Sequence, residues 1–355
     1  MYSFYGERGD VIGWFERRVR SGRRLVSLEK DDLPWTVKPI PPRIVVVGDI
    51  HGDLAGLACI LRDRRLIDKK GRWSGGGTHL VLNGDLVGGG NARLLLHYII
   101  RLSSEARTGG AGVHALLGNH DVRVFSKGYQ KRLGKTLFRE LPLTGARAAS
   151  PRAAFAGDTA FARFLRERNA LLRIGPHLFA HAGLNEWAFR HHPKRINATI
   201  RAWIRFWQGA GEQPDPHTEW LALGPGVALE SASAGPLWTT SFKTKQPPDE
   251  EQISRALDPD DLSRLLRRYG AKRLILGHSP TTTGEIMLSH PYYGETVIML
   301  DTRIRDKKRG RLSCLEIRGD ELEAVYPKRV SFGEELQKRE LKRLRKDKTR
   351  RKKRG

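Results

Sequence analysis

Short apolar segments that each end in a polar cluster recur between residues 43 and 327, and they constrain the fold more than any other feature. They read "RIVVVGDIHGD", "THLVLNGDLVGGG", "VHALLGNHD", "HLFAHAG", "RLILGHSP" and "TVIMLDTR". Each contains a run of about five mostly apolar residues, typical of a buried strand, and is closed by Gly, Asp, Asn or His. We therefore expect strands whose polar ends gather at one edge.

A segment with helical spacing follows each of the first two strands. Residues 54–66 and 91–107 carry apolar side chains three and four positions apart, which predicts two helices. Strands that alternate with helices form sheets covered by those helices. The last portion, "GRLSCLEIRGDELEAVYP", instead alternates in polarity around the turn Gly319-Asp320 and predicts a hairpin. The predicted fold class is mixed α/β.

Composition indicates a globular chain. Its 355 residues, 39% of them hydrophobic, suffice for the core of one or two domains. No segment approaches the roughly 20 uninterrupted apolar residues that cross a bilayer, and the N-terminus has no apolar block followed by a small-residue cleavage site. We expect a cytoplasmic protein without a transmembrane segment. Cys59 and Cys314 lack C-x-x-C spacing and are expected to be buried core residues.

The chain divides into three predicted parts. Residues 1–42 are expected to form an N-terminal arm packed on the core, because "PIPP" stops regular structure just before the first strong strand. Residues 43–327 form the main domain, in which residues 185–270 lie between the fourth and fifth polar clusters and are expected to cap the site. Residues 328–355 form a basic tail.

Positive charge is concentrated in this tail but not confined to it. The net charge is +25; residues 338–355 hold twelve Lys and Arg against Glu340 and Asp347, a net of +10, which leaves +15 elsewhere. Leu341 and Leu344 are the only large apolar side chains of residues 338–355, so we expect disorder, or a frayed helix when alone. No aromatic residue is interleaved. We expect weak, salt-dependent contact with nucleic acid or an anionic surface.

The polar strand ends supply the side chains that bind divalent metals. In an α/β sheet, loops at the carboxyl ends of strands share one edge, so distant segments converge there. Asp and Asn are ordinary turn residues, and a lone His is more often structural than a ligand. Several such clusters in succession nevertheless predict a metal site. Its candidate side chains are Asp49, His51, Asp53, Asn83, Asp85, Asn119, His120, Asp121, His181 and His278.

The order and spelling of "GDIHGD", "NGDLVGGG", "GNHD", "HAGL" and "GHSP" resemble the calcineurin-like metallophosphoesterases, within them the phosphoprotein phosphatase branch. "GPLWTTSF", "ILGHSPTTTGEI", "VIMLDTR" and "GRLSCLEI" are similar to strings in bacterial Shewanella-like protein phosphatases. "GNHD" and "HAGL" also resemble the diadenosine tetraphosphatase-like branch. The resemblance implies two stacked mixed β-sheets flanked by helices, and it makes residues 43–327 a metallophosphoesterase domain.

This resemblance also implies a centre of two divalent metal ions, Mn, Fe or Zn, and a metal-bridging hydroxide that attacks phosphorus. Asp49 and His51 would bind the first ion and Asp85 would bridge. The second ion would be completed by Asn119, His181 and His278. His120 is the expected acid for the leaving oxygen, and either Asp121 or Asp53 would hold its ring.

The sequence departs from this family at two phosphate-binding positions. Where phosphoprotein phosphatases usually continue as Asp-Arg-Gly, this chain has Gly88 and Gly89, and where the Shewanella-like proteins have Trp-Tyr-Arg, Trp238 is followed by two threonines. Gly and Thr cannot replace the bidentate grip of Arg on phosphate. Arg123 and Arg303 are the candidate replacements.

Three functions are consistent with the sequence. The first is a metal-dependent hydrolase of phosphomonoesters, in particular a serine/threonine phosphoprotein phosphatase. The second is a dinucleoside polyphosphate or nucleotide hydrolase, which the missing arginines favour. The third is a nucleic-acid-binding protein on a phosphoesterase scaffold, which the charge favours but the intact set of metal-capable residues opposes.

Overall fold

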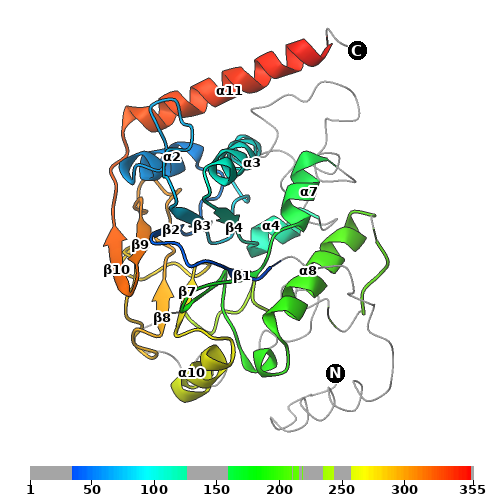
Figure 1. Ribbon diagram of the computed structural model, residues 1–355, viewed down its shortest axis with the longest axis vertical. Coiled ribbons are helices and arrows are strands. Elements are labelled where there is room, and N and C mark those ends of the chain that lie inside the picture. Colours follow the sequence, from blue (N-terminus) through cyan, green and yellow to red (C-terminus); the bar gives the residue numbers. More distant parts are fainter. Residues whose placement is uncertain are drawn as a thin grey trace.

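The computed structural model describes residues 34–125, 159–209, 211–215, 218, 235–243 and 257–352. Two five-stranded mixed sheets stack face to face, with helices outside them (Figure 1). The first sheet has the order β10-β9-β2-β3-β4. Its strands are β2 (Ile44–Val47), β3 (His79–Leu82), β4 (Val113–Ala115), β9 (Cys314–Arg318) and β10 (Glu321–Val325). Strands β2, β3 and β4 are parallel, and β9 and β10 form the predicted antiparallel hairpin.

The second sheet has the order β1-β5-β6-β7-β8. Its strands are β1 (Thr36–Val37), β5 (Leu171–Ile174), β6 (His177–Ala180), β7 (Arg273–Leu276) and β8 (Val297–Met299). Strands β6, β7 and β8 run parallel, and β5 is antiparallel to β6. The predicted fold class, two stacked mixed sheets in an α/β protein, is confirmed.

The side chains of β2 alternate between two hydrophobic cores. Val45 and Val47 join the large core beneath the helices, whereas Ile44 and Val46 join a second core between the sheets. Successive side chains of a strand point to opposite faces, so an unbroken apolar run requires cover on both. The strand is therefore central, and its polar continuation leaves the core only at its carboxyl end.

Helices cover the outer faces of the sheets. Helices α2 (Leu54–Asp63) and α3 (Ala92–Thr108) agree with the two predicted helices, and Asp53 and Asn91 cap them by accepting hydrogen bonds from Gly56 N and Leu94 N. The remaining described α-helices are α4 (Asn119–Arg123), α7 (Ala160–Arg166), α8 (Pro193–Trp207), α10 (Pro259–Arg268) and α11 (Ser331–Lys352), with a short 3-10 turn at Glu186–Phe189. None of the described helices is long and apolar enough to span a membrane.

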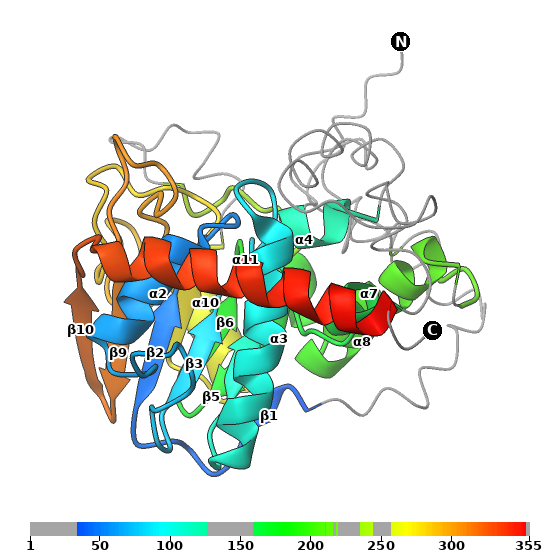
Figure 2. The same ribbon diagram turned by 90° about the horizontal axis from the view of Figure 1, so that it is seen from above.

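Residues 331–352 were predicted to be disordered or, when alone, a frayed helix, and in the structure they are helical. Helix α11 occupies them and lies across α2 and α3 (Figure 2). Leu336 is fully buried, and Phe332, Leu341 and Leu344 pack against the large core. A Cβ atom on Gly333 would overlap the Ala55 carbonyl, so the helices touch through their backbones. These contacts with the core stabilise α11, although a solitary helix of this composition is marginal.

Parts of the predicted arm and cap lie outside the described residues, namely 1–33 and most of 210–256. The described end of the arm contributes β1, which pairs in parallel with β5. Trp203 of α8 is almost fully buried and stacks on Phe206 and Trp207, so it is a packing residue. Both cysteines are buried and free, as predicted.

An ion-pair cluster around the buried carboxylate of Glu316 links β9 to Arg43, the residue before β2, and makes stability depend on pH. Burial acts to raise the pKa of Glu316, but hydrogen bonds from Arg43 (2.9 and 2.7 Å) and Arg318 (2.8 Å) outweigh it and lower that pKa to about 2. The pairs therefore add stability above the ordinary pKa of 4.5. This contribution is lost as the pH falls towards 2.

We predict that Glu316→Gln lowers the free energy of unfolding by about 1 to 3 kcal/mol at pH 7. The variant also flattens the loss of stability between pH 5 and pH 2, because its side chain does not titrate. Urea unfolding at several pH values measures both effects. Glu323→Gln, at an exposed position of the hairpin strand β10, serves as the matched control. Parallel pH profiles for wild type and Glu316→Gln would contradict the prediction.

Candidate metal centre

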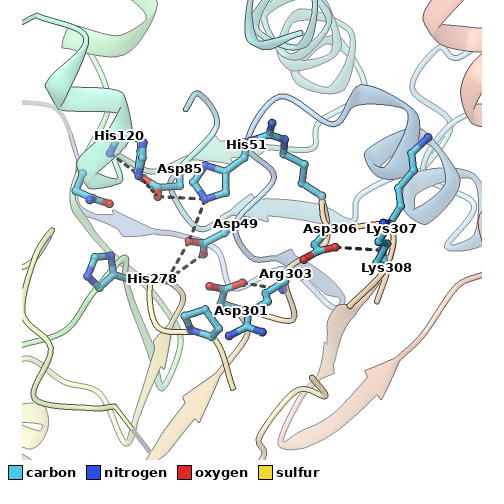
Figure 3. A pocket seen from close by; sticks show the side chains of 13 residues that line it. Asp49, His51, Asp85, His120, His278, Asp301, Arg303, Asp306, Lys307 and Lys308 are labelled. Atoms are coloured by element: carbon cyan, nitrogen blue, oxygen red, sulfur yellow. Dashed lines mark hydrogen bonds and ion pairs between the residues drawn. The ribbon is translucent and has the colours of Figure 1, made fainter. Parts of the chain in front are cut away.

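The carboxyl ends of strands from both sheets converge on one pocket of about 650 Å³. Asp49 and His51 follow β2, Asp85 follows β3, and His278 follows β7. Five of the six predicted ligands line the pocket, and the sixth, His181, lies fully buried after β6. The structure thus brings together all six side chains that sequence reasoning selected as ligands (Figure 3 shows four of them labelled).

Asp85 is the centre of this arrangement. Its Oδ2 lies 3.6 Å from His51 Nε2 and 3.9 Å from His120 Nε2, whereas its Oδ1 lies 3.4 Å from His181 Nε2. In the described part of the chain, two groups of side chains have ligand atoms close enough to hold an ion, and Asp85 belongs to both. They are His51, Asp85 and His120, and Asp49, Asp85 and His181. One carboxylate that faces two donor sets has the geometry of a bridge.

The imidazoles are oriented for ligation. His51 Nδ1 lies 3.0 Å from the Val87 carbonyl, and His181 Nδ1 lies 3.0 Å from the Asn83 carbonyl. A carbonyl accepts only from a protonated nitrogen, so each contact leaves the lone pair on Nε2, which points towards Asp85. His181 Nε2 is also 3.0 Å from Asn119 Oδ1. Imidazole nitrogens and carboxylate and amide oxygens are therefore gathered in one place.

The electrostatics of the site suit cations. Burial, with Asp301 and Asp85 nearby, raises the pKa of Asp49 well above its ordinary value, and burial beside Asp121 does the same to Asp85. Burial lowers the pKa of His51 and, with His278 beside it, of His181. A divalent cation stabilises such a donor set of clustered carboxylates and neutral imidazoles. The ion favours the charged form of the carboxylates, which burial alone opposes. The residues present fit a metal centre.

Backbone conformation adds to this assignment. His51, Asp85 and His278 have φ angles of 46°, 50° and 65°, a left-handed conformation that non-glycine residues adopt at a cost. Arg303, with φ 55°, and Arg65 are the other such residues in the described part of the chain. The surrounding strand ends hold these three predicted ligands in the left-handed conformation, and all three residues line the pocket.

His120, the predicted acid, lines the same pocket and sits against His51 with ring centroids 4.9 Å apart. Burial, with the charges of His51 and Arg123 next, lowers the pKa of His120 to about 3, so its ring is neutral at pH 7. It can donate a proton only when a nearby anion raises that pKa. Its role as the acid stays a prediction.

The two carboxylates expected to hold this ring have other partners. Asp121 accepts hydrogen bonds from the backbone N–H groups of Gly118 (2.8 Å), Val87 (2.9 Å) and Leu86 (3.3 Å). Burial still raises the pKa of Asp121 to about 6. Asp121 therefore ties the start of α4 to the loop after β3. Asp53 caps α2 and forms an ion pair with Arg329 (2.6 Å).

The two arginines proposed as phosphate clamps lie in different surroundings. Arg303 lines the pocket beside Asp301, and the backbone N–H of Arg303 donates to the Asp301 carboxylate (2.8 Å) (Figure 3). Arg123 stacks on the Trp238 ring, 4.5 Å from its centroid, and its charge acts on Asp85 and His120. Neither placement tests phosphate binding, so both remain proposals.

Sequence reasoning missed several pocket residues. Asp301 follows β8 as the other carboxylates follow their strands, and "VIMLDTR" carried the same signal. The loop after it supplies Arg305, Asp306, Lys307 and Lys308 to the pocket wall (Figure 3 labels the last three). These cations follow no motif, because only the fold places their loop over the site.

Comparison with known proteins identifies the family. A family model described as calcineurin-like phosphoesterase matches residues 42–281, more than half of the chain. This chain belongs to the calcineurin-like phosphoesterase family. The phosphoesterase is 28% identical over 284 residues to Shewanella-like protein phosphatase 2 of Arabidopsis thaliana, with 69% of this chain and 68% of that protein covered. It is 34% identical over 92 residues to Shewanella-like protein phosphatase 1 of Plasmodium berghei (strain Anka), which covers 26% of this chain and 24% of that one.

The fold has solved counterparts. The phosphoesterase superimposes on the cold-active protein-tyrosine phosphatase of a psychrophilic Shewanella species with a TM-score of 0.62 and 22% identity, over 86% of each chain. Another structure of cold-active protein tyrosine phosphatase gives a TM-score of 0.63, also at 22% identity, over 86% of this chain and 83% of that one. The resemblance and the enzyme class predicted from the motifs are confirmed: the protein is a phosphoric ester hydrolase of a family with a divalent metal centre.

Gly88 provides a test of the centre. Its φ is 107°, and a Cβ atom there would lie 2.6 Å from His120 Nδ1 and 2.9 Å from His51 Nδ1. We predict that Gly88→Ala displaces these rings and lowers affinity for Mn²⁺ at least about tenfold, as changes behind a ligand do. Isothermal titration calorimetry with Mn²⁺ measures the change.

Gly76→Ala is the matched control, because Gly76 also has a left-handed φ of 55° but nothing within 4 Å of the added atom. Both variants place an alanine at a positive φ, and only Gly88→Ala meets the imidazoles. Equal Mn²⁺ affinity in the two variants would show that His51 does not bind the metal.

Proposed function

We propose that this phosphoesterase hydrolyses phosphomonoesters and acts on phosphoserine and phosphothreonine in proteins. The observation that carries the proposal is Asp85, whose two oxygens face separate sets of donor side chains within one open pocket. The Shewanella-like protein phosphatases among its relatives support a protein substrate. An open, cation-lined pocket also suits a phosphate group on a large partner.

The donor set suits two divalent ions, and we assign them to Mn, Fe or Zn because the ligands offer only nitrogen and oxygen. Asp49 and His51 would hold one ion, Asn119, His181 and His278 the other, with Asp85 shared. When bound, the ions would activate water as a nucleophile at neutral pH and offset the charge of the phosphoryl oxygens.

The protein side chains supply the remaining chemistry. The backbone N–H of His278 donates to Asp49 (3.0 and 3.2 Å) and that of His120 to Asp85 (2.9 Å), so both carboxylates stay fixed while substrate binds. His120 Nε2 lies near Asp85 in the pocket, where a phosphoryl dianion would raise the pKa of the ring. In that state His120 would protonate the leaving oxygen of the serine or threonine side chain.

A nucleotide substrate is the second candidate. Basic side chains line one part of the pocket, namely Arg303, Arg305, Lys307 and Lys308, with the carboxylate of Asp306 among them. A substrate with several phosphates in a row would meet this positive charge. The same cations also suit acidic residues around a phosphorylation site. Substrate comparison decides between the two.

We expect the Mn²⁺-loaded protein to hydrolyse p-nitrophenyl phosphate and phosphopeptides, with kcat/KM for phosphoserine and phosphothreonine peptides above that for diadenosine tetraphosphate. Asp85→Asn removes the shared charge and is expected to lower kcat/KM at least about 100-fold. Asp320→Asn, in the exposed turn of the β9-β10 hairpin, controls for loss of one carboxylate. Phosphate release and calorimetric Mn²⁺ binding are measured on the same samples.

Each result is decisive for a different part of the proposal. Wild-type activity in Asp85→Asn would remove the shared-carboxylate mechanism. Hydrolysis of diadenosine tetraphosphate in preference to every phosphopeptide would reassign the substrate to nucleotides. A loaded wild-type protein that releases no phosphate from any compound would overturn the proposed function.

The basic C-terminus is proposed to contact nucleic acid or another anionic surface, and a cytoplasmic location remains a prediction. Residues 345–355 carry eight Lys and Arg and one Asp. They lie beyond Leu344, the last of the four apolar residues of α11 that pack on the core. Truncation after Leu344 therefore removes charge without removing that packing.

We predict that this truncation weakens binding to duplex DNA, RNA or vesicles with anionic lipid, and that it reduces the salt dependence of that binding. The melting temperature and hydrolysis of p-nitrophenyl phosphate stay unchanged. Fluorescence anisotropy and vesicle sedimentation at two salt concentrations measure the effect. Unaltered affinity for all three anionic partners would remove the proposal.

A further inference from the structure

Arg305 lies over a glycine of the site. Gly89 is buried, and a Cβ atom there would overlap the guanidinium of Arg305 at Nη1 and Cζ. The arginine thus fills the space that a side chain at position 89 would occupy, although it comes from the loop after β8. Gly89 follows Gly88, which packs on the rings of His120 and His51. The guanidinium is therefore next to the imidazole end of the pocket.

The positive charge of Arg305 acts on the histidines of this site. Its cation acts on His51 and His120, lowering the pKa of both rings. No carboxylate in the described part of the chain forms an ion pair with it, whereas its loop neighbours Lys307 and Arg309 pair with Glu334 (3.4 Å) and Asp306 (2.9 Å). An unpaired guanidinium that lines an anion-accepting pocket is available to a ligand.

The loop that carries Arg305 is anchored on both sides. Ile304 is almost fully buried, and its carbonyl accepts a hydrogen bond from Arg329, which also pairs with Asp53 (2.6 Å). On the other side, Asp306 accepts hydrogen bonds from the N–H groups of Lys308 (3.0 Å) and Arg309 (3.1 Å). A fixed loop places the guanidinium with little loss of entropy when an anion binds.

We propose that Arg305 is a phosphate-binding residue that grips the oxygens of the phosphoryl group from the Gly89 side of the pocket. The inference rests on the proposed function, since it names the residue that binds the group to be hydrolysed. Arg303 is less suited to this task, because its charge acts on Asp301. A planar guanidinium matches two phosphoryl oxygens at once, which neither Lys307 nor Lys308 can do.

Backbone geometry allows the arginine to be moved. Gly89 is not among the glycines with a left-handed φ, so a larger residue is compatible with its backbone once Arg305 is gone. The double variant Gly89→Arg with Arg305→Gly puts a guanidinium into the same space from the opposite wall. Recovered phosphate binding in this variant shows that the position of the guanidinium matters. A general effect of the Arg305 substitution on folding would not be reversed by a second substitution at Gly89.

The experiment measures kcat/KM for p-nitrophenyl phosphate and, by calorimetry, binding of inorganic phosphate to the Mn²⁺-loaded protein. For Arg305→Ala and Arg305→Gly we expect both quantities to fall about 10- to 100-fold, the range for losing hydrogen bonds to a charged group. Mn²⁺ affinity stays within about twofold. Arg305→Lys gives an intermediate value, and the double variant recovers at least about tenfold over Arg305→Gly.

Arg309→Ala is the matched control, since Arg309 lies on the same loop, is exposed and does not line the pocket. We expect it to match wild type. Arg305→Ala with unchanged phosphate affinity and unchanged kcat/KM would overturn the inference, as would equal losses in Arg309→Ala. If wild type hydrolyses no phosphomonoester, the proposed function fails, but phosphate calorimetry still decides whether Arg305 binds the anion.

Discussion

The burial of carboxylates between the ends of two sheets is the constraint on which the rest of the site depends. Asp49 and Asp85 are almost inaccessible to solvent, and burial raises the pKa of both. Such a cluster is costly unless cations or hydrogen bonds offset it. The N–H groups of His278 and His120 donate to these carboxylates, and the remaining charge favours divalent ions.

Glycines of the strand-end motifs make this crowding possible. A Cβ atom on Gly118 would overlap Asp85, and one on Gly277 would overlap Asp49. Each glycine follows one strand and leaves room for a ligand from another. The motif "GNHD" therefore combines a proposed ligand, Asn119, with space for Asp85, and its meaning becomes visible only when neighbouring strands are placed. Close approach explains why glycine precedes so many of the polar residues.

The candidate ligands could be located from the sequence because their positions follow from strand ends. Apolar runs located β2, β3 and β7, and convergence of parallel strands brought Asp49, Asp85 and His278 together. Helix α11 was missed, because its apolar side chains are too few to stabilise a helix without the surface of α2. Ion pairs across the fold, such as Glu316 with Arg43, also leave no local pattern, since strand pairing alone creates them.

The pocket wall that we propose to bind phosphate shows the limit of position-by-position reasoning most clearly. Gly88 and Gly89 lack the side chains that the family resemblance led us to expect, yet neither leaves empty space: imidazoles pack on the first, and a guanidinium from another loop covers the second. A site is defined by where charge and shape lie, and several segments can supply the same group. Loss of an arginine from one strand end is therefore weak evidence for loss of phosphate binding when a neighbouring loop carries another.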